Sequence, residues 1–73
     1  MQKVEINAIY KHYKGGLYRV ICIAKHSETL EDLVIYEALY DNPDSKLWAR
    51  PMNVFIGKVV VDGKEVERFT KQD

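Results

Sequence analysis

Two apolar runs decide the fold: LYRVICIAKH at residues 17–26 and LVIYEALY at residues 33–40. The segment between them, SETLED, is mostly polar. Both runs are rich in β-branched and aromatic side chains and lack an apolar stripe at helical spacing, which favours strands over helices. They therefore predict one long antiparallel hairpin, with more apolar surface than a single buried face requires.

Alternation along a strand assigns its side chains to two opposite faces. We predict that the even-numbered residues face the interior, since only His26 among them readily carries a charge near neutral pH: Tyr18, Val20, Cys22, Ala24, His26, Val34, Tyr36, Ala38 and Tyr40. The odd-numbered set still carries four large apolar residues: Ile21, Ile23, Ile35 and Leu39. These four residues predict either a strongly bent strand that covers them or a homodimer interface.

Short strands and turns complete the sheet around this hairpin. Glycine-containing turns at Gly15-Gly16 and Asp62-Gly63 predict two further hairpins. Pro51 ends regular pairing, and a single helical turn is expected after it. The expected strands are Ile9–Tyr13, Leu17–His26, Leu33–Tyr40, Leu47–Arg50, Val59–Val61 and Lys64–Val66. Residues 1–8 are expected to form an arm or an edge strand, and residues 70–73 a frayed tail.

These elements predict an all-β fold: a small SH3-like barrel of five to six antiparallel strands, forming a single domain over residues 1–73. The chain has 11 basic and 11 acidic residues, so a general polyanion-binding protein is disfavoured. Its lone Cys22 fits a reducing compartment. Because no run has the length of a signal peptide core or a membrane span, we expect a cytoplasmic protein with no membrane partner.

Polar residues that could carry chemistry are few. His26 beside Glu28, with Arg50, is the one candidate acid–base set, because a histidine near a carboxylate can act as a general base. The competing interpretation, which we favour, is that Ser27 and Thr29 satisfy loop amides while His26 bonds the rim of the sheet. Two histidines and one cysteine are too few for a four-ligand zinc site, so no metal or cofactor is expected.

Aromatic residues interleaved with cations indicate a function more strongly than the acid–base set does. They predict a non-enzymatic binding module with an aromatic and basic groove for a peptide or another ligand, lined by Tyr10, His12, Trp48 and Arg50, with His26 and Glu28 nearby. An alternative is single-stranded nucleic acid, with phosphates held by Lys11, Lys14 and Arg19 beside Arg50. A small enzyme or enzyme subunit is a third possibility. The competing structural interpretation is that most of these rings fill a small core.

Several short motifs occur in an order and spacing that resemble a known family. They are Tyr10-Lys11-His12-Tyr13-Lys14-Gly15, Tyr18-x-Val20, His26-Ser27-Glu28-Thr29, Val34-x-Tyr36, Leu39-Tyr40, Trp48-x-Arg50-Pro51, Phe55 and Asp62-Gly63-Lys64. The set resembles an uncharacterised family of short bacterial proteins described as a domain of unknown function. The resemblance covers about residues 6–69. It implies an SH3-like small barrel and no established activity.

Overall fold

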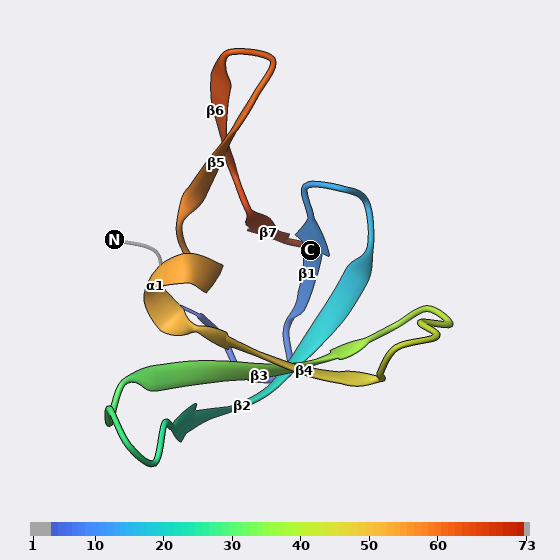
Figure 1. The fold of residues 1–73 in the computed structure, drawn as a ribbon. Coiled ribbons are helices and arrows are strands. Elements are labelled where there is room, and N and C mark those ends of the chain that lie inside the picture. Colours follow the sequence, from blue (N-terminus) through green and yellow to red (C-terminus); the bar gives the residue numbers. More distant parts are fainter. Residues whose placement is uncertain (1–3, 73) are drawn as a thin grey trace.

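The computed structural model describes residues 4–72, which form seven strands and one short helix (Figure 1). In chain order these are β1 (Ile9–His12), β2 (Leu17–Lys25), β3 (Asp32–Ala38), β4 (Leu47–Pro51), α1 (Met52–Phe55), β5 (Lys58–Val61), β6 (Lys64–Glu67) and β7 (Phe69–Lys71). The main sheet is antiparallel, in the order β4-β3-β2-β1-β7. The β5–β6 hairpin projects from it (Figure 1). The predicted all-β class and the helical turn after Pro51 are confirmed.

The Asp62-Gly63 turn that joins β5 to β6 has the geometry expected of its sequence. Asp62 has φ 51° and Gly63 has φ 78°, and Val61 pairs directly with Lys64. Two consecutive residues with positive φ are characteristic of a type I′ turn, whose twist matches that of the flanking strands. The hairpin predicted from this dipeptide is therefore present.

A β-bulge in β2 reverses the inside and outside of that strand. Val20 pairs with Tyr36 but Cys22 pairs with Ile35, so Ile21 is an extra residue in the ladder. One extra residue shifts the alternation by one for the rest of the strand. Val20 is fully buried as predicted. Beyond the bulge the prediction is wrong: Cys22 is exposed, and Ile23 packs against the core instead.

The bulge also accounts for part of the surplus apolar surface on the odd-numbered face. Ile23 is covered because the strand bends there, and Ile35 is half-buried. Ile21 and Leu39 stay 38% and 40% exposed. A homodimer contact through these two residues remains a prediction.

Residues 70–72 are ordered where a frayed tail was predicted. Phe69, Thr70 and Lys71 form β7, which pairs antiparallel with β1, and the Gln72 amide donates to the Ile9 carbonyl at 2.8 Å. The prediction of a frayed tail is therefore wrong for Thr70 and Lys71. The cause is the open edge of β1, whose unpaired backbone groups accept a strand, together with Phe69, which is buried and anchors that strand.

The N-terminal segment follows β2 without forming a strand of its own. The Asn7 amide donates to the Val20 carbonyl at 2.8 Å, and the Val20 amide donates to Ala8 at 3.0 Å. Val4 and Ala8 pack against the core. The predicted arm is thus a packed arm over residues 4–8; residues 1–3 and 73 lie outside the described part of the chain.

The core lies on the inward face of the main sheet and is closed by α1. Its buried cluster contains Tyr10, Val20, Val34, Tyr36, Phe55 and Phe69. Phe55 of α1 stacks on Phe69 of β7, with ring centroids 4.0 Å apart and planes 9° apart. Between residues 4 and 72, no helix has the length and apolar character needed to cross a membrane.

Candidate functional site

The inward face of the sheet continues beyond the core into a hollow of about 410 Å³, which we call the groove. It is lined by His12, Lys14, Gly16, Tyr18, Tyr36, Tyr40, Asn42, Trp48, Arg50 and Phe69. The sheet register explains this grouping. Trp48 pairs with Tyr36 and Arg50 with Val34, so both β4 side chains share the face of the buried β3 residues. The groove is thus the open end of the same face that builds the core.

Tyr18 is the centre of the aromatic wall of the groove. Its ring lies 5.2 Å from Tyr36, 5.5 Å from Tyr40 and 5.8 Å from Phe69 between centroids, each pair close to edge-to-face. The Tyr18 and Tyr40 hydroxyls are hydrogen-bonded to each other. A Cβ atom at Gly16 would lie 2.9 Å from Tyr40 Cε1, so the turn approaches this tyrosine pair closely because residue 16 is glycine.

Of residues 4–72, two cations line the groove and no carboxylate does. The Arg50 guanidinium carbon lies 5.5 Å from the centre of the Phe69 ring, a cation–π distance that holds the side chain over the aromatic wall. Lys14 lies in the turn after β1. Trp48 is held by a hydrogen bond from its indole Nε1 to the Ser45 carbonyl at 3.1 Å.

His12 is a neutral member of this cationic lining. Burial lowers the pKa of His12 below its ordinary 6.5, and the nearby charges of Arg50, Arg68 and Lys14 lower it further. Its Nδ1 accepts a hydrogen bond from the Lys14 amide at 3.2 Å. In a neutral imidazole the proton then sits on Nε2, an assignment that follows from this bond. His12 therefore offers an N–H donor without a charge.

We expect this pKa to respond to Arg50. In an NMR titration, His12 should titrate below 6.5, and Arg50→Gln should raise its pKa because one neighbouring positive charge is removed. Because the folded-state pKa is depressed, the contribution of His12 to stability is lost as pH falls from 6.5 through that pKa. Lys46→Gln removes a cation outside the groove and is the matched control. An unchanged His12 pKa in Arg50→Gln would show that Arg50 does not act on the ring.

Tyr18 should lose its proton at an unusually high pH. Burial, followed by the hydrogen bond to Tyr40, raises the pKa of Tyr18 to about 12. The folded protein then holds this proton more tightly than the unfolded chain, so stability should fall as pH rises from 10 towards about 12. Tyr40→Phe removes the hydrogen bond and should lower the Tyr18 pKa, as measured by tyrosinate absorbance. Tyr13→Phe, which leaves that bond intact, should not; equal effects of both variants would refute the assignment.

The structure brings together three of the six residues predicted to bind a ligand: His12, Trp48 and Arg50. Tyr10 is not among them. It is 3% exposed, packs in the core, and its hydroxyl accepts a hydrogen bond from the Glu5 amide at 3.0 Å. The prediction that Tyr10 lines the groove is wrong because its position, two residues before His12, is already covered by α1 through Phe55, whose ring lies 5.4 Å away.

His26 and Glu28 lie in the connection between β2 and β3 and do not line the groove. β2 begins beside the groove and runs for nine residues, about 30 Å of strand, before it reaches this connection. His26 Nδ1 accepts hydrogen bonds from the Glu28 amide at 3.1 Å and the Thr29 amide at 3.3 Å. His26 therefore organises the loop, and the acid–base set of His26, Glu28 and Arg50 is not assembled.

The three cations predicted to hold phosphates are divided between the two faces. Lys14 lines the groove, but Lys11 and Arg19 do not. Arg19 pairs with Glu37, and both alternate with inward-facing neighbours, which places them on the other face of the sheet. Over residues 4–72, no three His, Cys, Asp or Glu side chains are close enough together to hold a metal ion.

Sequence reasoning left several groove residues out of the predicted site. Tyr18 and Tyr36 belong to the predicted inward set, so strand alternation carried the signal that would have included them. Phe69 lies just before the predicted tail of residues 70–73, and no strand was predicted there to bring it to the groove. Gly16 and Asn42 had no such signal, since a turn and a loop bring them to the groove.

Comparisons with known proteins agree with this architecture. The family model described as a protein of unknown function, DUF1653, matches residues 8–71. No curated protein matches the chain. A crystal structure of a DUF1653 protein from Bordetella bronchiseptica is similar, with a TM-score of 0.82 and 29% sequence identity, and the match covers 94% of this chain and 87% of that one. The chain belongs to the DUF1653 family of proteins of unknown function.

Proposed function

We propose that this protein is a non-enzymatic binding module whose groove holds an anionic group of its ligand. One observation carries the proposal: among the residues that the structure describes, those lining the groove include Lys14 and Arg50 but no carboxylate. The other polar side chains of the lining are His12, Asn42, the tyrosines and Trp48, all of which can donate hydrogen bonds, although the Trp48 indole already donates to the Ser45 carbonyl. An anion would therefore meet donors and positive charge on several sides.

The aromatic wall supports a ligand that also presents a flat or apolar part. Tyr40 is 43% exposed, and Tyr18 and Trp48 are half-buried, so ring surface is accessible in the groove. A hollow of about 410 Å³ lies within the range of sites that hold small ligands. Aromatic surface beside cations suits a ligand that carries both a ring and a negative charge.

The same arrangement weighs against the alternatives. An enzyme built on His26 and Glu28 has no support, because neither residue lines the groove. A nucleic-acid strand gains affinity from many phosphate contacts, and only Lys14 and Arg50 of the four proposed cations line the groove. A bacterial and cytoplasmic setting, expected from the sequence, forms part of this proposal.

Simple aromatic ions test the proposal. Trp48 is the single tryptophan, so its indole N–H is a unique NMR reporter in the groove. Phenyl phosphate and benzoate should shift this signal in a saturable way, whereas benzylammonium should not, because the groove repels cations. Arg50→Gln should weaken binding of the anions by about tenfold or more, as expected when a charged hydrogen-bond donor is lost.

Lys58→Gln provides the matched control, because it removes one positive charge from β5, outside the groove. It should leave anion binding unchanged. Equal responses to benzylammonium and benzoate, or no saturable response to either anion, would overturn the proposal.

A further inference from the structure

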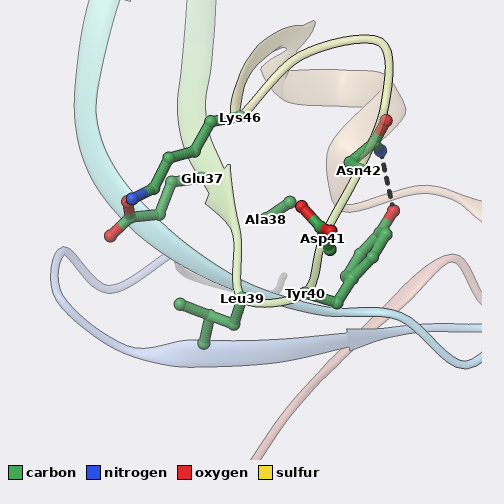
Figure 2. Close-up of a pocket in the computed structure, with 7 residues that line it drawn as sticks. All are labelled: Glu37, Ala38, Leu39, Tyr40, Asp41, Asn42 and Lys46. Atoms are coloured by element: carbon green, nitrogen blue, oxygen red, sulfur yellow. Dashed lines mark hydrogen bonds and ion pairs between the residues drawn. The ribbon is translucent and has the colours of Figure 1, made fainter.

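The face of the main sheet opposite the groove carries a mostly apolar set of side chains on β2 and β3. Alternation along β3 and the bulge in β2 place this set on one surface, which we call the outer face. Figure 2 shows its edge at the end of β3, where Glu37 and Leu39 point away from Tyr40 and Asn42, which line the groove. The outer face comprises Leu17, Arg19, Ile21, Cys22, Ala24, Leu33, Ile35, Glu37 and Leu39.

Two opposite charges, Arg19 and Glu37, lie at the centre of the outer face. They are direct partners in the β2–β3 register, yet their charged groups are not within 4 Å of each other. The Arg19 Nε is buried and has no hydrogen-bond partner among residues 4–72. Glu37 is 3.8 Å from Lys46, whose side chain is 76% exposed, so that ion pair is weak. A buried guanidinium donor without a partner is unfavourable, and both charges can accept a partner from outside the chain.

We infer that the outer face is the contact surface of a homodimer, in which Arg19 of each copy pairs with the partner's Glu37. The inference uses the outer face alone and does not depend on the proposed function. The groove lies on the other face of the sheet and stays open in such a dimer.

The register of β2 and β3 makes the outer face complementary to itself. A two-fold axis that runs between these strands, parallel to them, places β2 of one copy over β3 of the other. Residues that are cross-strand partners within one sheet then meet across the interface. Arg19 meets the partner's Glu37, and symmetry makes the same contact a second time.

The apolar residues of the outer face match in the same way. The Leu39 amide donates to the Leu17 carbonyl at 2.9 Å, so Leu17 meets the partner's Leu39 across the interface. Ile21 precedes Cys22, which pairs with Ile35 in the ladder, so the bulge packs on the partner's Ile35. Leu17, Ile21 and Leu39 are 41%, 38% and 40% exposed in the single chain. The dimer removes this apolar surface from water while each charge meets its opposite.

Charge complementarity favours a second copy over other occupants. A nucleic-acid strand on this face would bring phosphates against Glu37, which repels them. A different protein would need one positive and one negative charge at the spacing of Arg19 and Glu37, with apolar residues on both sides. A second copy has that pattern by symmetry. Dimerisation also supplies the additional buried surface from which a chain of 73 residues gains stability.

Charge reversal on the two sides of the contact tests the dimer. Sedimentation velocity of the wild-type protein should show a dimer. Arg19→Glu and Glu37→Arg should each be monomeric, because like charges meet at both contacts. An equimolar mixture of these two variants should form a heterodimer, because every contact then joins opposite charges. An effect of either substitution within its own chain cannot produce this recovery.

The matched control is the pair Lys64→Glu and Glu65→Lys, which makes the same changes of net charge on the projecting hairpin. Both control variants should remain dimeric without mixing. Arg19→Gln is a milder variant that adds no repulsion and keeps the test valid if charge reversal impairs folding. It should weaken the dimer by about fivefold to tenfold, because the lost ion pair occurs twice.

Three results would overturn the inference. The first is a wild-type protein that stays monomeric at millimolar concentration. The second is a wild-type dimer whose dissociation constant is unchanged by Arg19→Gln. The third is a mixture of folded Arg19→Glu and Glu37→Arg variants that does not associate.

Discussion

Phe69→Ala should unfold the protein at ordinary temperature. Phe69 is 1% exposed, stacks on Phe55 at 4.0 Å and makes edge contacts with Tyr18, Tyr36 and His12. Truncating a buried phenylalanine costs about 3–5 kcal/mol. A single core of this size rarely contributes more than about 3–5 kcal/mol of net stability. The substitution therefore removes about as much free energy as the fold has.

Circular dichroism and urea denaturation would measure this effect, with Thr70→Ala as the control in the same strand. Thr70 is exposed, so its truncation should change the free energy of unfolding by about 0.5 kcal/mol or less. A Phe69→Ala protein with a wild-type unfolding midpoint would mean that β7 is not part of the folded core. A second variant, Phe69→Leu, keeps most of the apolar volume and should remain folded with reduced stability.

Short sequence motifs predict the turns and strand ends, because the residues there determine the local backbone conformation. Asp62-Gly63 specifies its turn because both residues tolerate positive φ, and Pro51 ends a strand because it lacks an amide hydrogen. β7 could not be predicted in this way. It consists of three residues and exists because β1 leaves an edge to pair with, a tertiary condition that no window of sequence contains.

In the candidate site, too, local sequence predicts some features and tertiary packing decides the others. Trp48 and Arg50 are two residues apart on one strand, so alternation alone predicts that they share a face. Tyr10 and His12 share a face by the same argument, yet one lies in the core and the other in the groove. Which of them is covered depends on where α1 packs. His26 and Glu28 were placed near the groove although a nine-residue strand separates their loop from it, and that distance was available from the sequence.

The bulge at Ile21 exchanges the faces of Cys22 and Ile23, and an aspartate substitution at each residue tests it. Ile23→Asp should be strongly destabilising and Cys22→Asp should be tolerated. Ile23 pairs with Val34, which is fully buried, and packs against the core, whereas Cys22 is exposed. A regular strand that keeps Val20 inside predicts the opposite order, with Cys22 buried and Ile23 on the surface.

We expect Ile23→Asp to lower the free energy of unfolding by at least about 2 kcal/mol, since it removes packed apolar volume and brings a carboxylate against the core. Cys22→Asp should change it by about 0.5 kcal/mol or less. Thermal denaturation of the two variants measures the order directly. Equal losses of stability would place both side chains at the core, and a larger loss for Cys22→Asp would show that β2 is regular. The bulge predicts that Ile23→Asp is the more destabilising of the two variants. Ile21 has no partner in β3, so the alternation shifts by one residue and Ile23 faces the core.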